Sequence, residues 1–411
     1  MMRVVQKFGG TSVGSLERIR KTADIVEREW KEGHEVAVVV SAMSGETNRL
    51  LQMARDLDYR AAPRELDALV ATGEEVSAAL LAIELCRRGL KAFSYNGMQV
   101  GFRTSNNFTR ARIRGMDADK FLAHMSQREI PVFTGFQGID EAGNITTLGR
   151  GGSDTSAVAV AIALKADICD IYTDVDGIYS TDPRIVPKAR KIDRISFEEM
   201  LEFASLGAKV LQTRSVELAM RHNMPIHLRS SFKDVPGTLV TQEDKSMERA
   251  SVTGVAYNRD EAKVTVQGIP DRPGIAASLF GPVAEAGINV DVIVQNVSEQ
   301  GFTDLTFTVP SADLDAALEL VRKQAEAMDA RNVIGGGGLA KVSIIGVGMR
   351  SHAGVAQKMF DTLAKSGINI HMITTSEIKV TVVIAAKDVD AAVQALHTAF
   401  GLDVEENATV G

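Results

Sequence analysis

The chain has 411 residues, 45% of them hydrophobic and 24% charged, which is typical of a globular protein with two or three domains. Its 46 Lys and Arg against 53 Asp and Glu give a net charge of −7, which argues against nucleic acid or an anionic membrane surface as the main partner. Cys86 and Cys169 are far apart and form no CxxC pair, which argues against a disulfide framework or a thiolate zinc site. Because no apolar run resembles a membrane span or a signal peptide, we expect a cytoplasmic protein that acts on small molecules.

A glycine-rich turn, Lys7 to Gly14, follows the apolar pair Val4-Val5 and precedes a helical pattern of apolar residues. Glycine lets the backbone approach an anion closely, and Lys7 and the N–H groups of the following helix would favour phosphate. The turn is not a Walker A loop, because its lysine precedes the glycines. Taken alone it is equally compatible with an ordinary tight turn, so its function depends on the other motifs.

Strand-like runs alternate with helical patterns down to about residue 230, which predicts a mainly parallel sheet between two layers of helices. The predicted strands are 4–7, 36–42, 92–95, 131–135, 168–173 and 225–228. In such folds ligands bind at the carboxyl ends of the strands, so the loops at those ends are candidate sites.

Two of these loops precede a second glycine-rich segment. The turn from Ser41 to Asn48 is rich in hydroxyl groups and is suited to a phosphate, to a polar substrate, or simply to capping a helix. Gly73 interrupts a helical pattern at a cost of about 1 kcal/mol relative to alanine. One reason for a glycine here would be to direct the next residue, Glu74, into a binding site, where its carboxylate would bind an ammonium group. The alternative is that Glu74 is an ordinary solvent-exposed glutamate.

The second glycine-rich helix entrance runs from Thr146 to Ser156 and holds three glycines, five hydroxyl groups and an Arg-Asp pair before an apolar helix. The forked guanidinium of Arg150 is suited to a carboxylate. We therefore expect a binding loop here.

The segment from Ile171 to Arg184 leaves a strand and turns through acidic residues, tyrosines and an arginine. Its Asp-x-Asp-Gly spacing does not match an EF-hand loop, and a nucleotide site fits better. Tyr179 would line an adenine pocket, Arg184 would meet phosphate, and an aspartate would help to hold Mg²⁺. Lys209, after a helix that begins with a capping box at Ser196, is a candidate second cation for phosphate.

The two glycine-rich segments and the run Tyr172 to Gly177, in this order, resemble the aspartokinases of the amino-acid-kinase superfamily over nearly the whole chain. The resemblance implies a three-layer αβα sandwich with a mainly parallel sheet, followed by two ferredoxin-like α+β ACT domains. It also implies transfer of the γ-phosphoryl group of MgATP to the β-carboxylate of L-aspartate. This reaction is the first step toward lysine, threonine and methionine, and Mg²⁺ would be held mainly by the ATP phosphates.

The same resemblance implies roles for individual residues. The implied catalytic residues are Lys7, Asp154 and Lys209. The implied ATP-binding residues are Lys7, Gly9, Gly10, Ser41, Thr173, Asp174, Tyr179, Asp182, Arg184 and Lys209. The implied aspartate-binding residues are Thr47, Glu74, Arg150, Gly151, Ser153 and Asp154.

The C-terminal part is an internal repeat with a constant offset in sequence, seen in Gly274/Gly354, Phe280/Phe360 and Asn289/Asn369. Each copy is predicted to run strand, helix, strand, strand, helix, and both resemble ACT domains, which bind amino acids. Lysine and/or threonine are the implied effectors. The implied effector residues are Asp271, Ile275, Asn289, Val290, Asp291 and Gln295 in the first copy and Val355, Ala356, Asn369, Ile370 and Ser376 in the second.

The predicted organisation is a catalytic domain at 1–245, a linker at 246–262, and ACT domains at 263–335 and 336–411, with the four glycines Gly335 to Gly338 between the copies. We expect a homo-oligomer formed through the ACT domains, and Met247 is placed to start a separately translated regulatory subunit. Two alternatives stay open: another ACT-regulated carboxylate or carbamate kinase, and a non-catalytic amino-acid sensor.

Overall fold

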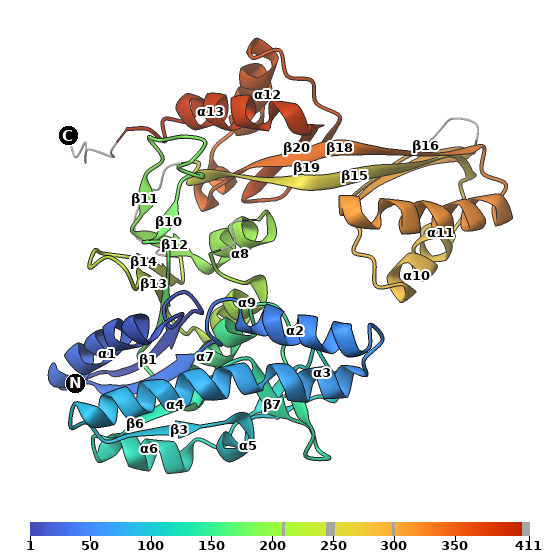
Figure 1. The fold of residues 1–411 in the computed structure, drawn as a ribbon. Helices are drawn as coiled ribbons and strands as arrows, with labels where there is room; N and C mark the ends of the chain where they lie inside the picture. The colour runs from blue at the N-terminus through green and yellow to red at the C-terminus, as the bar shows by residue number, and fades with distance from the viewer. Residues whose placement is uncertain (208–209, 244–250, 298–300, 405–411) are drawn as a thin grey trace. The chain divides into compact units, whose positions relative to one another are not determined.

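The computed structural model describes residues 1–207, 210–243, 251–297 and 301–404, which form two compact units (Figure 1). The first unit takes in the described parts of 1–178, 191–205 and 209–247, and the second those of 179–190, 206–208 and 248–411. The short segment 179–190 therefore belongs with the C-terminal half of the chain. Within the described residues, no helix has the length and apolar character needed to cross a membrane.

The first unit is built on an eight-stranded sheet. In sheet order its strands are β12 (Arg194–Ser196), β14 (Thr238–Thr241), β13 (Ile226–Ser230), β9 (Ile168–Thr173), β1 (Arg3–Phe8), β2 (Glu35–Val40), β6 (Ile130–Thr134) and β3 (Ala92–Tyr95). Every neighbouring pair is parallel except β13 with β14. All six strands expected from the sequence lie in this sheet, which confirms the mainly parallel topology.

Helices cover both faces of this sheet. The described helices of the unit are α1 (Leu16–Lys31), α2 (Glu46–Leu57), α3 (Pro63–Val70), α4 (Thr72–Arg87), α5 (Gly97–Val100), α6 (Asp119–Ser126), α7 (Gly152–Ala163), α8 (Phe197–Ser205) and α9 (Thr213–His222). Phe8 at the end of β1 packs in a core with α1 and α4, whereas the side chain of Lys7 meets α7. Because successive residues of a strand point to opposite faces, α7 covers the other side, and the three-layer prediction is confirmed.

Smaller strands complete the unit. A four-stranded sheet has the order β5 (Ile113–Gly115), β4 (Arg103–Thr104), β7 (Gln137–Ile139) and β8 (Ile145–Thr147). Two short strands, β10 (Ile178–Tyr179) and β11 (Lys191–Ile192), flank the segment 179–190. The sequence pattern had not predicted these elements, which are only two or three residues long.

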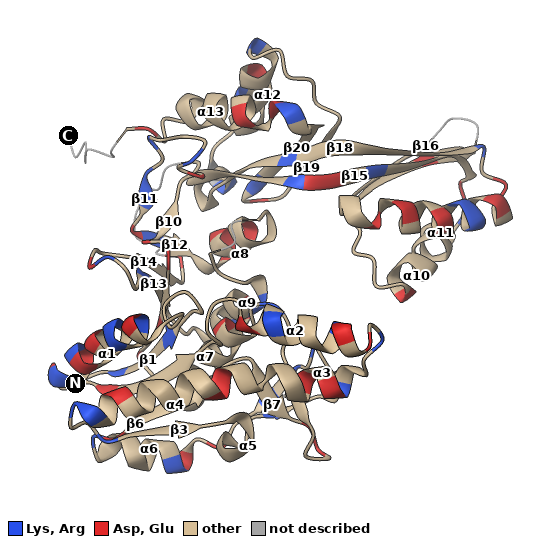
Figure 2. Cartoon of the chain, in the orientation of Figure 1, with Lys and Arg blue, Asp and Glu red and all other residues tan. Residues whose placement is uncertain are grey.

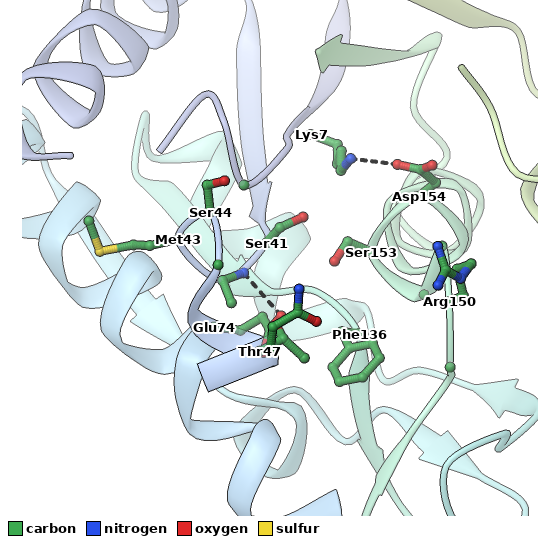
Figure 3. Close-up of a pocket in the computed structure, with 17 residues that line it drawn as sticks. Lys7, Ser41, Met43, Ser44, Thr47, Glu74, Phe136, Arg150, Ser153 and Asp154 are labelled. Atoms are coloured by element: carbon green, nitrogen blue, oxygen red, sulfur yellow. Dashed lines mark hydrogen bonds and ion pairs between the residues drawn. The ribbon is translucent and has the colours of Figure 1, made fainter. Parts of the chain in front are cut away.

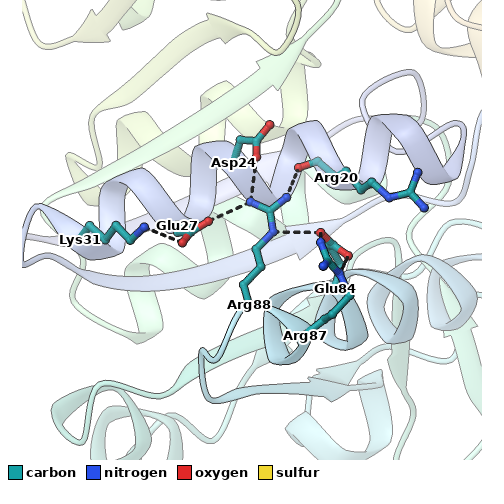
Figure 4. Close-up of polar contacts among 7 residues, drawn as sticks. All are labelled: Arg20, Asp24, Glu27, Lys31, Glu84, Arg87 and Arg88. Carbon is teal, nitrogen blue, oxygen red and sulfur yellow. Dashed lines mark hydrogen bonds and ion pairs between the residues drawn. The ribbon is translucent and has the colours of Figure 1, made fainter.

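Charged residues of both signs alternate along α1 (Figure 2), and several of them meet Arg88 at the end of α4 (Figure 4). The Arg88 guanidinium donates to Asp24 Oδ1 at 2.8 Å, Glu27 Oε2 at 2.9 Å and Glu84 Oε1 at 2.9 Å, and also to the Arg20 carbonyl at 2.9 Å. The Arg88 side chain is mostly buried, so these charge-assisted bonds tie α1 to α4 where water screens them little.

We expect Arg88→Met to lower the free energy of unfolding of the first unit by about 2 kcal/mol, because three carboxylates lose a buried partner. Arg87→Met is the matched control, since Arg87 is exposed and bonds only to Glu84 among the residues described; its cost should stay below about 1 kcal/mol. Urea unfolding followed by the fluorescence of Trp30, the only tryptophan, measures both. Equal losses would contradict the assignment.

The second unit contains a six-stranded antiparallel sheet. In sheet order its strands are β16 (Asp291–Val297), β17 (Phe302–Val309), β15 (Gly254–Pro270), β18 (Asn332–Ile345), β20 (Lys379–Ala385) and β19 (Met372–Thr375). Its helices are α10 (Ile275–Glu285), α11 (Leu314–Ala327), α12 (Val355–Lys365) and α13 (Val389–Ala399). Figure 1 shows α10 and α11 on one side of the sheet and α12 and α13 on the other.

The internal repeat is confirmed in three dimensions. The helices α10 and α12 keep the offset of the sequence repeat at both ends, and each follows a left-handed glycine, Gly274 at φ 92° and Gly354 at φ 87°. The order strand, helix, strand, strand, helix also holds in both copies. Each copy has its own hydrophobic core.

Two predicted features near the copies were wrong. The range 246–262 was expected to be a linker, but β15 begins at Gly254, and Val255 contributes to the core of the second copy. The four glycines were expected between the copies, but they lie inside β18. A Cβ on Gly335 would stand 2.6 Å from Leu318 Cδ1, so at this position a glycine lets α11 pack on the strand. Met247 lies outside the described residues.

Candidate active site

A pocket of about 300 Å³ lies in the first unit, where the chain leaves β1, β2 and β6 (Figure 3). Three helices begin beside it: α2 contributes Thr47, α4 contributes Glu74, and α7 contributes Ser153 and Asp154. The carboxyl ends of neighbouring parallel strands meet at one edge of the sheet, which explains why loops distant in sequence come together here.

Lys7 and Asp154 form an ion pair in the pocket, with Lys7 Nζ 2.6 Å from Asp154 Oδ1. Both side chains are about nine-tenths buried. Lys7 belongs to the rigid central strand β1 and Asp154 to the first turn of α7, so the ammonium group is held in a fixed position. A cation held in this way is suited to stabilising charge on a bound anion.

The first glycine-rich loop packs closely on the end of β9 and on the loop after β2. Gly9 N–H donates to the Tyr172 carbonyl at 3.2 Å, and Ser44 N–H donates to the Gly10 carbonyl at 3.1 Å. A Cβ on Gly10 would stand 2.8 Å from the carbonyl oxygen of Ala42, so glycine is required for this approach.

The helix that directly follows this loop does not line the pocket. The sequence pattern suggested that the helix directly after the loop would point its N–H groups at the ligand, but none of the residues lining the pocket belongs to α1. Instead, Ser15 caps α1 by accepting from Arg18 N–H. The helix start beside Lys7 is that of α7, which begins after left-handed Gly151 and whose N-terminal dipole favours an anion.

Glu74 is buried, with 3% of its surface exposed, so it is not a solvated glutamate. Its Oε1 accepts from Ala42 N–H at 3.0 Å, and its Oε2 has no hydrogen-bond partner in the described part of the chain. Burial raises the pKa of Glu74 to about 8. A Cβ on Gly73 would stand 2.9 Å from Ala42 Cβ, which explains the glycine inside this helix. A buried, incompletely bonded carboxylate is suited to a cationic ligand group.

The loop before α7 carries Arg150 at the mouth of the pocket. Arg150 is exposed and forms no ion pair with any carboxylate that the structure describes. Gly149 and Gly151 have positive φ values of 77° and 71°, and a Cβ on Gly151 would stand 1.9 Å from Gln212 Cγ. The two glycines therefore set the path of the loop, which leaves the guanidinium available to a ligand.

The pocket thus brings together most of the residues expected to bind aspartate or to face the phosphoryl group, together with Ser41, which was expected to bind the nucleotide. These are Lys7, Gly10, Ser41, Thr47, Glu74, Arg150, Gly151, Ser153 and Asp154. Gly9 lies next to the lining residues, with Lys7 Nζ 3.5 Å from the position of a Cβ there.

Of the residues expected to bind ATP, Lys7, Gly10 and Ser41 line the pocket, whereas Thr173, Asp174, Tyr179, Asp182 and Arg184 do not. Thr173 and Asp174 follow β9 and bond to each other, Thr173 Oγ1 donating to Asp174 Oδ1 at 3.0 Å. Tyr179, Asp182 and Arg184 belong to the second unit. There Arg184 Nη2 lies 2.8 Å from Asp182 Oδ2, and this contact holds the pKa of Asp182 down to about 2. Lys209 lies outside the described residues.

The expected effector residues all belong to the second unit, where they lie in or beside α10, β16, α12 and β19 and directly after β15. Ile275 and Val355 open α10 and α12 and are buried in the cores of the two copies. Asp291 opens β16 and pairs with Lys341, which also contacts Glu261 Oε1 at 2.7 Å. An effector that used the Asp291 carboxylate would therefore compete with Lys341.

Several residues that support the site were missed in the sequence. Asp67, fully buried in α3, accepts from Thr147 N–H at 2.8 Å, from Thr147 Oγ1 at 2.6 Å and from Thr109 N–H at 2.8 Å. Arg214 donates to the carbonyls of Leu148 and Ala111 at 3.0 and 2.8 Å. Both hold the chain just before the Arg150 loop. In the sequence they are single charges in helices, with no pattern to distinguish them from surface residues.

The pocket lies where parallel strands end, which is the usual place for a ligand in an α/β fold, and the comparisons with known proteins identify the family. The model of the amino acid kinase family matches residues 2–230, and two ACT domain models match residues 264–326 and 342–400. The chain belongs to the amino acid kinase family, with tandem ACT domains after the kinase domain.

Full-length relatives identify the type of kinase. An aspartate kinase of Pseudomonas fluorescens is 56% identical over 406 residues, 98% of each chain, and an aspartokinase of Helicobacter pylori is 48% identical over 406 residues, 98% of this chain and 100% of that protein. At this identity and coverage the chain belongs to the aspartate kinase family. Among solved structures, E. coli aspartokinase III in complex with aspartate and ADP has a TM-score of 0.79 and 30% identity, covering 96% of this chain and 99% of that chain. The same enzyme with lysine and aspartate has a TM-score of 0.75.

Proposed function

We propose that this chain transfers the γ-phosphoryl group of ATP to the β-carboxylate of L-aspartate, the first step toward lysine, threonine and methionine, under feedback control by lysine and/or threonine. One observation carries the catalytic part. A single pocket combines the buried Glu74 carboxylate, the Arg150 guanidinium, which has no carboxylate partner among the described residues, and a buried ammonium group held by Asp154. These charges complement an amino acid with a carboxylate to be phosphorylated.

Glu74 and Arg150 would bind the ends of aspartate. The free Oε2 of Glu74 would accept from the substrate ammonium group, and Arg150 would meet a carboxylate with its forked donors. Thr47 and Ser153 would supply hydroxyl groups. E. coli aspartokinase III, which binds aspartate and ADP, supports this choice of substrates.

Lys7 would face the phosphoryl group, together with Gly9, Gly10 and Lys209. In the transfer, a β-carboxylate oxygen attacks the γ-phosphorus while the bond to the bridging oxygen breaks, and ADP leaves with that electron pair. The attacking carboxylate has an ordinary pKa of about 4, so it is ionised at neutral pH and no general base is needed. Catalysis then consists of in-line positioning and neutralisation of phosphoryl charge. Asp154 would orient Lys7 and would not accept a proton.

The nucleotide would contact Ser41, Thr173, Asp174, Tyr179, Asp182 and Arg184. Mg²⁺ would arrive with ATP as part of the substrate, held mainly by the phosphates. In the described residues, the only group of His and carboxylate side chains close enough to share a metal ion is Glu29, Glu32 and His34, and none of them lines the pocket.

The raised pKa of Glu74 predicts how aspartate binding depends on pH. Below about pH 8 the free carboxyl is protonated, and an ammonium ligand would require it ionised, so binding releases a proton. Affinity for aspartate should therefore rise with pH, by at most about tenfold per unit, and level off near pH 8. Calorimetry between pH 6 and 8.5 measures this, with Glu74→Gln as the control that removes the dependence. A flat profile in the unsubstituted protein would refute the assignment.

The ACT domains would carry the regulation. The expected effector residues lie in or beside α10, β16, α12 and β19 and directly after β15, and a lysine complex of E. coli aspartokinase III supports lysine as one effector. We further propose a homo-oligomer formed through these domains and a separate regulatory subunit that starts near Met247.

The experiment for the whole proposal is ADP release measured with a panel of amino acids, each with and without lysine plus threonine. The proposal requires release that depends on L-aspartate and falls when the effectors are added. Release with other carboxylates or carbamate, but not with aspartate, would favour a different acceptor. If aspartate-dependent ADP release were the same with and without lysine plus threonine, the proposed reaction would still be supported and the proposed feedback control would be contradicted.

A further inference from the structure

The segment 179–190 leaves the kinase part of the sequence but packs with the second ACT copy. Val186 lies in the same hydrophobic core as Val255 and Leu396. Val255 N–H in β15 donates to the Ser180 carbonyl at 2.7 Å, and Gln394 Nε2 in α13 donates to the Ile185 carbonyl at 3.0 Å. The segment is thus fixed to the second unit along its length.

The centre of this attachment is a buried serine, histidine and aspartate. His397 in α13 has its Nε2 atom 2.9 Å from Ser180 Oγ and its Nδ1 atom 2.7 Å from Asp403 Oδ1. Ser180 is 1% exposed and His397 is 0% exposed. The arrangement resembles a catalytic triad, but a hydroxyl that no substrate can reach does not act as a nucleophile.

Hydrogen bonds of Ser180 connect the two ends of the segment 179–190 to each other and to His397. Burial lowers the pKa of His397, so the imidazole is neutral near pH 7, and the acceptor Asp403 fixes the proton on Nδ1. Nε2 then accepts from the Ser180 hydroxyl, which itself accepts from Arg190 N–H at 2.9 Å. Ser180 N–H donates in turn to the Arg190 carbonyl at 2.8 Å. One side chain therefore joins both ends of the segment to α13.

The residues expected to bind the nucleotide are the neighbours of this serine. Tyr179 precedes it directly, and Asp182 and Arg184 follow within four residues. Tyr257 in β15 donates its hydroxyl to Asp182 Oδ2 at 2.9 Å, and Arg184 pairs with the same carboxylate. Any shift of Ser180 would move these side chains, because the segment is short and bonded at both ends.

We infer that His397 is a positioning residue for ATP: by holding Ser180 it fixes the segment that carries the predicted nucleotide-binding residues. The inference rests on the nucleotide assignment within the proposed function. The hydrogen bond between Ser180 and His397 could not be predicted from the sequence, because the two residues are 217 positions apart. It implies that a residue of the second ACT copy sets the affinity for ATP without touching it.

The test measures binding directly, so that it does not depend on turnover. The Kd for a non-hydrolysable ATP analogue with Mg²⁺, and separately the Kd for aspartate, are measured by calorimetry on the full chain. Losing the bond to Ser180 in His397→Phe should weaken analogue binding by about tenfold or more and leave aspartate binding within twofold. His397→Gln, which keeps a hydrogen-bonding group near the Nε2 position, should recover part of the loss.

Ser343→Ala is the matched control. It removes a buried hydrogen bond of the same unit, Ser343 Oγ to Thr381 Oγ1 at 2.6 Å, that does not involve the segment, and both affinities should stay unchanged. Unaltered analogue binding in folded His397→Phe, or equal losses for both ligands, would overturn the inference. If His397→Phe does not fold, Ser180→Ala is measured in its place, and the same result is expected: weaker binding of the ATP analogue and unchanged binding of aspartate.

These outcomes also separate the inference from the proposed function. Absence of aspartate-dependent turnover in the unsubstituted protein would refute the proposed function, while a selective loss of analogue binding in His397→Phe would still support the positioning role. Normal turnover with unchanged analogue binding would overturn the positioning role alone.

Discussion

Lys7→Ala is expected to lower kcat by about 10²-fold or more while the affinity for aspartate changes little. The Lys7 ammonium lies 2.6 Å from Asp154 on a central strand, where it would neutralise charge that develops on the transferring phosphoryl group. Such a contact is stronger in the transition state than in the ground state, so its loss appears in kcat. Steady-state rates with both substrates varied give the measurement.

Two further variants make this result interpretable. Lys91→Ala removes an exposed lysine of the same unit, 4.0 Å from Glu129, and should leave kcat unchanged. Lys7→Ala combined with Asp154→Asn removes the unpaired buried carboxylate that the single change leaves behind, so it should recover stability without recovering turnover. Near-normal turnover in folded Lys7→Ala would refute the phosphoryl-binding role of this residue.

Glu74→Gln and Arg150→Ala are each expected to raise the KM for aspartate by about 10²-fold and the KM for ATP by less than a few-fold. Within the described part of the chain, Glu74 offers a buried carboxylate with an oxygen that accepts no hydrogen bond, and Arg150 offers a guanidinium without a carboxylate partner at the mouth of the pocket. Removing either would leave one charged end of a bound amino acid without its partner. Initial rates measured with each substrate varied in turn give the two KM values, and their comparison shows whether only the KM for aspartate has changed.

The neighbour Glu75 provides the matched control for Glu74. Glu75 is in the same helical turn but does not line the pocket, and its carboxylate accepts from Asn96 at 3.5 Å. Glu75→Gln should therefore leave both KM values unchanged. If the Glu74 and Arg150 variants affected the two substrates equally, their assignment to the amino acid would be wrong.

The parts of the fold that depend on local pattern could be predicted from the sequence. The six predicted strands all join the large sheet. The offset between the ACT copies, read from matching residues, is the same for both ends of α10 and α12. Periodicity and turn residues determine these elements, and neighbouring residues in the chain carry that information.

The parts that depend on contacts between distant segments could not be predicted. The strand β15 extends back to Gly254 because residues 254–258 pair with 341–345 of β18, and no local pattern reveals that pairing. Similarly, the helix start beside Lys7 is that of α7, which lies far along the chain, and not that of the adjacent α1. Asp67 and Arg214 support the Arg150 loop through hydrogen bonds to backbone groups far away in sequence.

The same distinction applies to the site residues. Residue type was enough to suggest Glu74 and Arg150, since an amino acid needs an anion and a cation to bind it, and the pocket contains both. Residue type gave no indication that segment 179–190 packs with the second ACT copy, because Val186 and Ser180 acquire their partners only on folding.

The most direct measurement of the central claim is trapping of the product with hydroxylamine, which converts an acyl phosphate to a hydroxamate. With MgATP and L-aspartate, the account predicts one β-aspartyl hydroxamate for each ADP formed, and none with Lys7→Ala beyond its residual turnover. Hydroxamate formed at the α-carboxylate, or ADP formed without any aspartate-derived hydroxamate, would contradict phosphoryl transfer to the β-carboxylate in this pocket.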